Sequence, residues 1–529
     1  MKIITYLVRN SIVALALALA ATAADARPFR WASQGDPQTI DPHSQNELLT
    51  NSINGQMYET LVNRGKKLEI VPALATEWQQ VDSLTWRFTL RKGVRFHDGT
   101  PFTVDDVLFS IQRASQATSQ IRVYATALGK PTKVDDYTVE FKLPEPNPIL
   151  LEHATLVQIM SRAWCEKHKV ERPLDFSARE ESYASLHANG TGPYMLKLRE
   201  PDVKTVMVRN PNWWGKPEGN VTEVTYLSIK SDATRVSALI AGNIDLILDP
   251  PPQDVARLRK QPGIKVIEGP ENRVIFFGFD QSRDELLYSD VKGRNPFKDR
   301  RVREAIYRAI DIEALKRVTM RGQALPTGGI TPSILASNPE AEKRLPYDPG
   351  RARQLLAEAG YPNGFGFTLD CPNNRYINDE QICVAVAGML AKIGLRVRVN
   401  AQPRAIYFAR LPKRDTSAYM LGWGGAITDA QTIFTPVLHS PDGKGAGDYN
   451  YGSYVNPKLD ALIDAARVEA DPAKRKREIA AAIAEHNAQI HHVPLHRQVI
   501  PWAMREDVHV VHRADNWIEA SWARIERRD

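Results

Sequence analysis

The amino-acid sequence predicts a mixed α/β fold arranged in several lobes, and three observations support this prediction. Some segments carry apolar residues at every second position, which is typical of strands with one buried face, while others repeat them at helical spacing. Several predicted helices lead directly into short apolar strands, as they do in α/β units. The chain of 529 residues is long enough for about three domains, and no low-complexity linker separates them, so we expect lobes that pack together.

Two alternating segments predict strands of one hairpin-like sheet. They span residues 84–90 and 137–143, and in each of them apolar side chains alternate with polar ones. Between them, residues 103–111 have helical spacing, with Thr103 as the expected N-cap. We therefore expect a sheet with a helix in the connection between its strands.

The middle of the chain continues with a turn, further strands and a helix. The sequence GTGPY at 190–194 predicts a turn that opens a β stretch, and residues 205–208 alternate again. Asp232 is the expected N-cap of a helix that ends at Gly242, and the apolar strand 244–248 follows it. A helix that leads into a buried strand predicts an α/β unit.

The C-terminal half repeats this pattern of helices and strands. Asp-Pro pairs at 348–349 and 471–472 predict an N-cap followed by proline in the first helical position. Asp379 is the expected N-cap of another helix, which leads into the alternating strand 395–399. The other elements expected in this half are a helix at 301–310, a strand at 367–371 and a buried strand at 418–421.

The first 26 residues predict a signal peptide for export. Lys2 and Arg9 form a positively charged start, and residues 11–23 are almost entirely small or apolar. Ala-Asp-Ala at 24–26 has the small residues that signal peptidase recognises, so we expect cleavage after Ala26. No cysteine follows the cleavage point, which argues against a lipid anchor and favours a soluble periplasmic protein.

The charge and hydropathy of the chain argue against two classes of protein. Its 69 basic and 62 acidic residues are interspersed, and removal of the signal peptide lowers the formal net charge from +7 to +6. Because there is no long basic run, we expect no nucleic-acid partner. No apolar run reaches the roughly 18–20 residues that a membrane-spanning helix needs, so the sequence does not predict an integral membrane protein.

Three cysteines, Cys165, Cys371 and Cys383, lie in the predicted mature chain. An oxidising compartment permits a disulfide, and Cys371 with Cys383 is the nearest pair in the sequence. Three separate buried thiols are the other interpretation, because bridging depends on a spatial distance that the sequence does not reveal.

The sequence lacks the common motifs of catalysis and of nucleotide or metal binding. It has no GxxxxGK[ST], no GxGxxG between a strand and a helix, no HExxH, no GxSxG and no CxxC. His486, His491 and His492 are close in sequence, but spacings of five and six place the last two away from the helical face of His486. We therefore expect structural histidines, no catalytic residues, no metal and no cofactor.

Two polar turns are the candidates for ligand binding. Trp423, Gly424 and Gly425 follow the buried strand at 418–421, where glycines let another molecule approach the backbone. A core tryptophan beside a tight turn is the alternative interpretation. Arg375 lies between a predicted strand and a helix, where its guanidinium is placed to bind a carboxylate, and a surface arginine is the alternative.

Five stretches of the chain resemble one known protein family. They are VPALATEW at 71–78, WRFTLRKGVRFHDGT at 86–100, DDV at 105–107, GTGPY at 190–194 and NPFKDRRVREAI at 295–306. These stretches resemble the extracellular solute-binding proteins of family 5, the dipeptide- and oligopeptide-binding components of ABC importers. The resemblance extends over nearly the whole mature chain, and the block 90–107 is highly specific.

The resemblance implies a three-lobed periplasmic binding-protein fold of class II type, in which two lobes close on a ligand by a hinge. Lobe II is inserted into a discontinuous lobe I, and lobe III closes over the ligand. The closed form, expected to be a monomer, then docks on inner-membrane permease subunits driven by cytoplasmic ATPases. The implied boundaries are 27–57, 187–275 and 501–529 for lobe I, 58–186 for lobe II, and 276–500 for lobe III.

The resemblance also implies a set of ligand-binding residues. Peptide-binding members have a Trp-x-x-Asp sequence whose carboxylate pairs with the ligand's α-ammonium, but here Ala426 occupies the acidic position. Asp429 or Glu47 is then the expected substitute, unless the ligand lacks a free amine there. Arg375 resembles the residue that holds the ligand carboxylate in dipeptide binders. The other implied contacts are Trp423, Gly424 and Gly425 in lobe III, and His43 and Asn46 in lobe I.

Two functions from different classes follow from these observations. The leading hypothesis is a transport receptor for a short peptide or for a peptide-like solute such as an opine-like conjugate, a modified amino acid or a metal chelate. The alanine at the acidic position favours the second group. The rival hypothesis is a periplasmic hydrolase of peptides or esters, which needs a nucleophile and a base within about 3 Å in a cleft.

Overall fold

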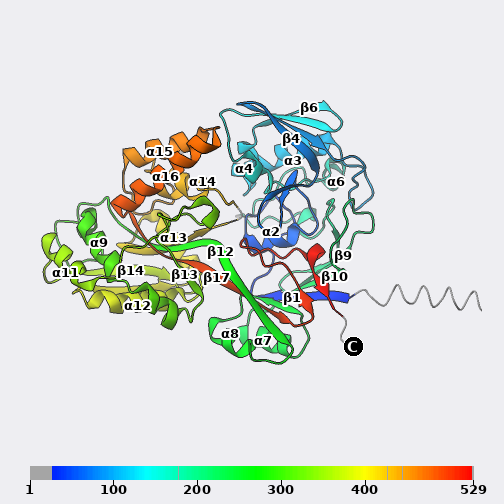
Figure 1. Cartoon of the computed structure of the whole chain (residues 1–529). Helices are drawn as coiled ribbons and strands as arrows, with labels where there is room; N and C mark the ends of the chain where they lie inside the picture. The colour runs from blue at the N-terminus through cyan, green and yellow to red at the C-terminus, as the bar shows by residue number, and fades with distance from the viewer. Residues whose placement is uncertain (1–26, 177, 426, 444, 527–529) are drawn as a thin grey trace, which may run out of the picture.

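The computed structural model of the chain describes residues 27–176, 178–425, 427–443 and 445–526. The predicted signal peptide and Ala426 lie outside the described residues. Figure 1 shows the chain as two bodies that are joined by long strands. Among the described residues, no helix is both long enough and apolar enough to span a bilayer.

One sheet of eleven strands runs through both bodies. Its order is β15-β14-β16-β12-β17-β11-β1-β10-β9-β8, and β13 pairs with β17 beside this path. The pairs β1–β10, β1–β11, β14–β15 and β14–β16 are parallel, whereas the other pairs are antiparallel. Its strands are β1 (Arg27–Ser33), β8 (Tyr194–Glu200), β9 (Lys204–Arg209), β10 (Val221–Ser228), β11 (Leu246–Leu248), β12 (Ile264–Phe279), β13 (Ala324–Pro326), β14 (Gly366–Pro372), β15 (Arg396–Gln402), β16 (Ala418–Gly424) and β17 (His492–Arg505).

A separate antiparallel sheet of four strands has the order β4-β5-β7-β6. The strands predicted at 84–90 and 137–143 are confirmed as β5 and β7, and they are neighbours with Trp86 opposite Phe141. Two short antiparallel pairs, β2–β3 and β18–β19, complete the strands. Their bounds are β2 (Val62–Arg64), β3 (Ile70–Pro72), β4 (Ala75–Asp82), β5 (Thr85–Leu90), β6 (Lys130–Asp135), β7 (Thr138–Lys142), β18 (Val508–His509) and β19 (Arg524–Ile525).

The helices begin close to where the sequence signals predict. Thr103 is the N-cap of α3, and Asp348 and Asp471 cap α11 and α16 through their side chains. Two predicted N-caps are wrong by one residue, because Ser231 caps α7 and Asn378 precedes α12. The helices are α2 (Leu48–Asn54), α3 (Val104–Ala114), α4 (Arg122–Ala127), α5 (Leu150–Ala154), α6 (Arg162–His168), α7 (Asp232–Ile240), α8 (Pro252–Leu258), α9 (Arg300–Ala309), α10 (Ile312–Ala314), α11 (Pro349–Glu358), α12 (Asp379–Ala391), α13 (Arg404–Arg410), α14 (Gln431–Ile433), α15 (Pro457–Val468) and α16 (Pro472–Gln489).

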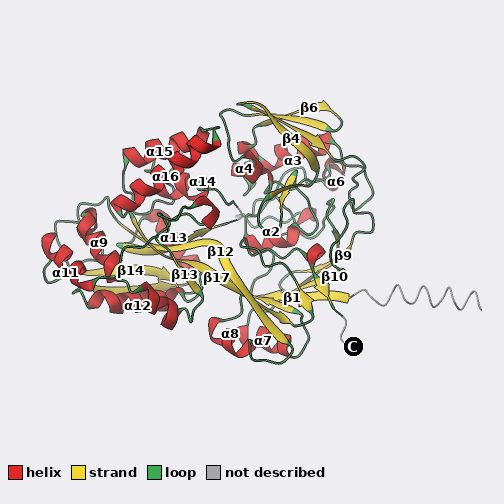
Figure 2. Cartoon of the chain, in the orientation of Figure 1, coloured by secondary structure: helices red, strands yellow, loops and turns green. Residues whose placement is uncertain are grey.

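The sheets and helices form three lobes, and each lobe has its own apolar core. Lobe I contains β1 and β8–β11, lobe II contains the four-stranded sheet, and lobe III contains β14–β16. In lobe III the core lies on both faces of the sheet, because Ile275 and Phe277 of β12 join one cluster and Val274 and Phe276 join the other. Figure 2 shows α12 on one side of this half-sheet and α15 and α16 on the other. The lobe boundaries themselves stay a prediction.

Two long antiparallel strands, β12 and β17, connect lobe I with lobe III (Figure 1). Their pairing is interrupted between Pro270 and Val274 and again between Ile275 and Phe276. Irregular pairing bends a strand and increases its twist locally. We therefore place the predicted hinge at residues 270–276, although the sheet itself continues from one lobe to the other.

The three cysteines, Cys165, Cys371 and Cys383, are all buried and free in the structure. Burial raises the pKa of Cys165 to about 12, which keeps this thiol protonated at neutral pH.

Candidate functional site

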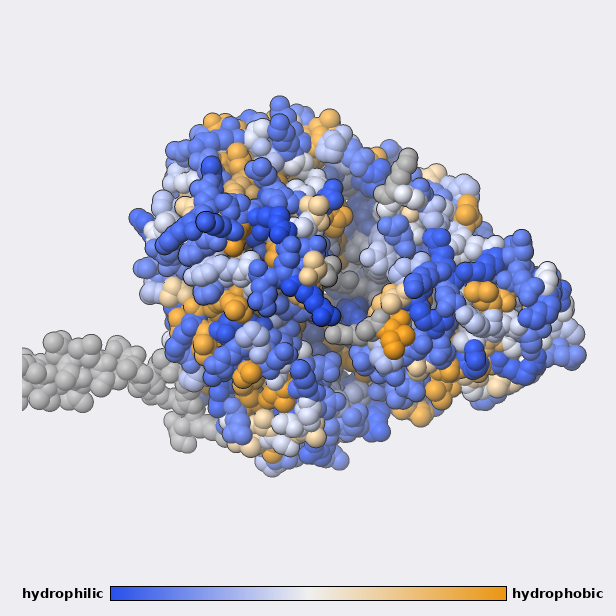
Figure 3. Space-filling view, turned by 180° about the vertical axis from the view of Figure 1, so that it is seen from behind, coloured by the Kyte–Doolittle hydropathy of each residue, from blue (hydrophilic) through white to orange (hydrophobic). Residues whose placement is uncertain are grey.

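A cleft separates lobe III from lobes I and II, and Figure 3 shows the molecule hollowed between these two bodies. The bodies also touch across it. Thr428 of lobe III donates its backbone N–H and its hydroxyl to the carboxylate of Glu152 in lobe II, at 2.9 Å in each case. Arg467 of α15 pairs with Glu145 of lobe II. Lobes II and III are therefore held together by side-chain contacts in this structure.

The glycines predicted to line the site lie where β16 approaches β12. Gly424 is paired with Arg273, and the N–H of Gly425 donates to the carbonyl of Asn272 at 3.2 Å. A Cβ atom on Gly424 would lie 2.4 Å from the carbonyl oxygen of Asn272, so a larger residue does not fit there. The carboxyl end of β16 is thereby held directly against the hinge region.

Trp423 is half-buried next to these glycines. Its indole N–H donates to the carbonyl of Thr432 at 2.6 Å, and its ring packs edge-on against Tyr449 at a centroid distance of 4.9 Å. Tyr449 is 44% exposed. The indole is thus oriented by fixed partners and still keeps exposed surface. Its contact with a ligand stays a prediction.

Arg375 lies in the loop after β14, and two neighbours hold this loop in place. The buried carboxylate of Asp379 accepts hydrogen bonds from the backbone N–H groups of Arg375 (2.9 Å) and Tyr376 (3.0 Å). The Tyr376 hydroxyl donates to the carbonyl of Gly422 at 3.2 Å. The exposed Arg375 guanidinium lies 5.3 Å from the Tyr376 ring. The structure therefore joins the Arg375 loop to the strand that carries Trp423.

These two loops share a topological position. The Arg375 loop leaves the carboxyl end of β14, the Gly425 segment leaves the carboxyl end of β16, and the two strands are adjacent and parallel. Ligands of open α/β sheets bind at the carboxyl ends of parallel strands. The topology thus brings together residues that are about 50 positions apart in the sequence.

Asp429 is already paired within lobe III. Arg475 of α16 contacts both of its carboxylate oxygens at 2.7 Å, and these side chains are 11% and 16% exposed. A carboxylate that already pairs with a guanidinium in this bidentate way is poorly suited to replace the missing acidic residue and bind the ammonium group of a ligand. Asp429 instead anchors the segment that contains Thr428.

His43 is fully buried rather than exposed to the cleft. Its Nε2 lies 2.8 Å from the carbonyl of Gln158, and its Nδ1 lies 3.1 Å from the guanidinium of Arg113. Arg113 in turn forms a buried bidentate pair with Asp41, at 2.6 and 2.9 Å. The ring supports the loop after β1, and in this conformation it has no exposed surface that a ligand could contact.

Asn46 and Glu47 lie on the same loop, closer to the surface. The amide of Asn46 donates to the Tyr124 hydroxyl at 3.4 Å, and Glu47 caps α2 by accepting from the N–H of Thr50 at 3.0 Å. Burial raises the pKa of Tyr124, and the phenol of Tyr449 raises it further. Tyr449 belongs to lobe III, so Asn46 and Tyr124 face the lobe that carries Trp423.

The prediction that His491 and His492 lie away from His486 is wrong for His492. The left-handed residue Ile490 reverses the chain after α16, so that Nδ1 of His492 comes within 3.0 Å of Nε2 of His486. Burial lowers the pKa of His486 to about 4 and that of His492 well below its usual value. In the part of the chain that the structure describes, no group of three histidine, cysteine or carboxylate side chains is arranged to hold a metal.

Comparison with known proteins assigns the family. Residues 69–445 match the family described as bacterial extracellular solute-binding proteins, family 5 Middle. The chain belongs to this family. The glutathione-binding protein GsiB of Escherichia coli O1:K1 / APEC is 26% identical over 488 residues, which is 90% of each chain.

Solved structures agree with this assignment at the level of the fold. The periplasmic binding protein DppA of Helicobacter pylori, in complex with the peptide STSA, is similar with a TM-score of 0.76 and 24% identity over 96% of this chain and all of that one. AgaA of A. tumefaciens R10, in complex with agropinic acid, has a TM-score of 0.76 and 22% identity over 95% and 99% of the two chains.

Several residues of this solute-binding protein were missed by sequence reasoning. Tyr376 and Asp379 hold the Arg375 loop, Tyr449 packs on Trp423, and Glu152 bonds to Thr428 from another lobe. Tyr376 is the one that the sequence signals best, because it directly follows the predicted Arg375. The contacts of the others depend on tertiary structure.

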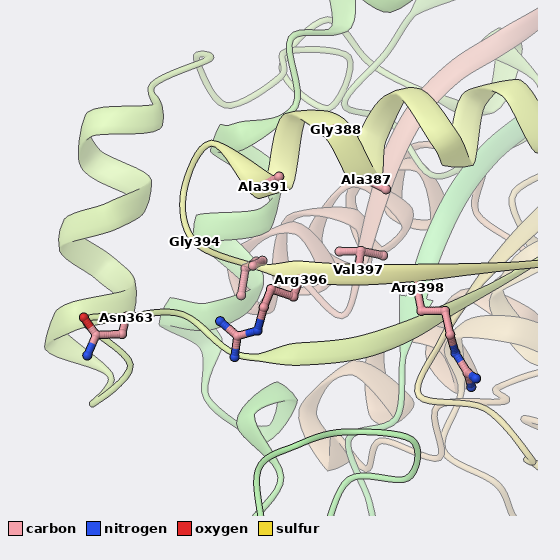
Figure 4. Close-up of a pocket in the computed structure, with 9 residues that line it drawn as sticks. Asn363, Ala387, Gly388, Ala391, Gly394, Arg396, Val397 and Arg398 are labelled. Atoms are coloured by element: carbon pink, nitrogen blue, oxygen red, sulfur yellow. The ribbon is translucent and has the colours of Figure 1, made fainter.

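A surface pocket of this family-5 protein opens at the outer edge of the lobe III half of the sheet. It has a volume of about 760 Å³ and opens between α12 and the edge strand β15, where Figure 4 shows Arg396 and Arg398 on the strand and Ala387 and Gly388 on the helix. None of the predicted site residues lines this pocket. We therefore assign no role to it in ligand capture.

Proposed function

We propose that this solute-binding protein captures a peptide or peptide-like solute between lobes I and III and delivers it unchanged to an inner-membrane ABC permease. The protein is exported, loses its signal peptide after Ala26 and works as a periplasmic monomer. The observation that carries this proposal is the hydrogen bond between Tyr376 and Gly422, which joins the Arg375 and Trp423 loops at the carboxyl ends of parallel strands.

The chemistry of the site favours a ligand with a carboxylate. In this proposal the Arg375 guanidinium binds that carboxylate, and the exposed part of Trp423 packs on the body of the ligand. Gly425, beside which the structure leaves open space, gives the ligand room next to Trp423, and Gly424 holds this segment against Asn272. Asn46 and Glu47 approach from lobe I. GsiB is described as binding glutathione, DppA was solved with a peptide and AgaA with agropinic acid, and this range supports a peptide or a peptide-like solute.

Capture follows from a shift between two states of the molecule. A ligand that contacts both lobes binds the closed state more tightly than the open one, and so increases the closed population. The irregular pairing of β12 and β17 gives the chain a place to bend, and the Thr428–Glu152 contact stabilises the closed side of the equilibrium. The permease then recognises the closed, loaded form.

Mass spectrometry of the small molecules released from purified, denatured protein tests this function directly. We expect a carboxylate-bearing peptide or peptide-like compound, which afterwards raises the melting temperature of stripped protein and remains intact on incubation. Conversion of that compound into a product with a first-order dependence on protein concentration would instead support the rival hypothesis of a periplasmic hydrolase.

A further inference from the structure

Asp249 is a lobe I carboxylate that sequence reasoning did not select. It directly follows β11, which is parallel to β1, so it lies at the carboxyl edge of the lobe I half of the sheet. Its backbone is left-handed, with φ of 49°, and three prolines follow it at 250–252. The side chain is half-buried.

The charge of Asp249 is not balanced by a direct partner among the described residues. Its one hydrogen bond there is a long one, 3.5 Å from Nδ2 of Asn516. Arg273, on the irregular segment of β12, donates to Glu271 at 3.1 and 3.2 Å, and Gln498 also donates to Glu271 at 2.8 Å. Two carboxylates and one guanidinium therefore leave a single net negative charge at this point.

The surroundings make that charge unfavourable in the empty protein. Burial and, to a smaller extent, the neighbouring Glu271 raise the pKa of Asp249 to about 6, against the opposing effects of Asn516, Arg235 and Arg273. Arg235 is committed to Asp232 and to the carbonyl of Ile229. A cation that arrived beside Asp249 would relieve this repulsion.

A second polar side chain, on the β12 segment that carries Glu271 and Arg273, also lacks a partner among the described residues. Asn272 lies between Glu271 and Arg273 on β12 and is 5% exposed, yet its Nδ2 has no hydrogen-bond acceptor among the described residues. Its carbonyl accepts the N–H of Gly425, so the same residue borders the loop of Trp423. Buried amides are normally paired, and an unpaired one beside the site is a donor that a ligand can satisfy.

We propose that Asp249 binds a cationic group of the ligand, and that in a peptide this group is the α-ammonium. The proposal rests on the function proposed above and adds the charge of the ligand to it. Asp429 is already paired with Arg475, and Glu47 accepts hydrogen bonds as the cap of α2. Both carboxylates that the sequence suggested are therefore less available than Asp249 to bind a cationic group. The acidic group lost at Ala426 of lobe III is thus replaced from lobe I, and the ligand is held as a zwitterion between Asp249 and Arg375.

The experiment compares pairs of compounds that differ only in their amino group. Isothermal titration with stripped protein uses glutathione and a panel of di- to tetrapeptides, each with a free and with an acetylated amino terminus. The variants are Asp249→Asn, which keeps shape and tolerates the left-handed backbone, and the control Asp254→Asn on α8. Asp254 is a partly exposed carboxylate of the same lobe that pairs with Arg257.

We expect the wild type to prefer the free-amine form and Asp249→Asn to bind that form about 10-fold more weakly or worse, with the acetylated form changed less than about 2-fold. Asp254→Asn should match the wild type. The role of Asp249 would be overturned if the wild type and Asp249→Asn bound a free-amine ligand with equal affinity. It would also be overturned if Asp249→Asn lost the same affinity for the free-amine and the acetylated ligand. Either result would leave the proposed function standing. Failure of the entire panel to bind the wild type would overturn both.

Discussion

Thr428 donates two hydrogen bonds to Glu152 from across the cleft, although 276 residues separate them in the sequence. The acceptor is held from its own lobe by Arg64, whose Nη1 lies 3.1 Å from Oε1 of Glu152. Arg64 is 3% exposed, so the carboxylate is presented by a buried partner. Because Thr428 lies between the Trp423 segment and Asp429, the contact links lobe closure to the loop that we propose binds ligand.

Thr428→Val should weaken ligand binding without unfolding the protein. The substitution removes the hydroxyl, which donates to the Glu152 carboxylate and accepts a long 3.5 Å bond from Arg64, and keeps the backbone bond. This loss destabilises the closed state by about 1.5 kcal/mol and lowers affinity about 10-fold. Calorimetric titration with the co-purified ligand checks this result, and Thr428→Ser, which keeps the hydroxyl, is the control. Identical affinity of the valine variant and the wild type would remove the contact from the closure mechanism.

Arg375→Ala should weaken binding of any carboxylate ligand by ~2 kcal/mol or more, because a charge-assisted pair is lost inside the closed cleft. The same ligand with an amidated carboxyl group should bind both proteins alike. Arg398→Ala is the matched control, since Arg398 lines the outer pocket on β15 and bonds to Thr368. If Arg375→Ala binds the carboxylate ligand as the wild type does, Arg375 is not in the site.

Trp423→Ala should reduce affinity by roughly 1–3 kcal/mol, because the ligand loses an aromatic contact and Tyr449 loses its packing partner. Trp423→Phe keeps an aromatic ring and should retain most of the affinity. Titration together with circular dichroism separates binding from folding. Unaltered affinity together with unaltered folding in Trp423→Ala would remove the stacking role.

The pKa of Asp249 predicts how the stability of the ligand-free protein depends on pH. This pKa is raised from 3.8 to about 6 in the folded state, chiefly by burial and then by Glu271. Between these values the folded state binds more protons than the unfolded state, so this group lowers stability as pH rises from about 4 to 6. Asp249→Asn should therefore stabilise the empty protein at pH 7.5, by on the order of 1 kcal/mol, and have little effect at pH 4.

Chemical denaturation of stripped protein at both pH values measures this difference. Asp254→Asn serves again as the control, and its effect should be the same at the two pH values. The free energy of unfolding should differ more between Asp249→Asn and the wild type at pH 7.5 than at pH 4. If the difference does not grow with pH, the ionised form of Asp249 does not destabilise the empty protein.

The buried pair of Arg113 and Asp41 should be essential for the loop that carries His43 and Asn46. Burial opposes ionisation of Asp41, but Arg113 outweighs it and lowers the pKa of this carboxyl to about 2. The stability that this pair provides is therefore present above about pH 4 and is lost as pH falls towards 2. Arg113→Met leaves Asp41 buried without a counter-charge and should cost about 3–5 kcal/mol.

Urea unfolding at pH 7 measures the loss in Arg113→Met, and Arg162→Met is a control with a 57% exposed arginine side chain whose effect should be close to zero. At pH 3 the two variants should differ from each other less than at pH 7. The Asp41 carboxyl is then largely protonated in the unfolded state, whose pKa is the ordinary 3.8, and this removes part of the stability that the pair provides. A loss that is the same at both pH values would mean that Arg113 acts through packing alone.

Sequence reasoning succeeded where the signal lies within a few residues. The strand pair β5 and β7, the N-cap at Thr103 and the Asp-Pro starts of α11 and α16 follow from side-chain period and capping. It failed by one residue at α7, where both Ser231 and Asp232 are good capping residues. It also misjudged His492, because helical spacing no longer applies once Ile490 turns the chain back.

By itself the sequence determined that the chain is mixed α/β, where its main helices and strands lie, and which family it resembles, since these depend on local patterns and short motifs. Only the tertiary structure decided that His43 is buried against Arg113, that Asp429 pairs with Arg475, and that the charge of Glu271 raises the pKa of Asp249. Each of these relationships joins residues from different elements. Burial and charge pairing arise when the sheet brings distant strands together, and no local pattern encodes which carboxylate is then left without a direct counter-charge among the described residues.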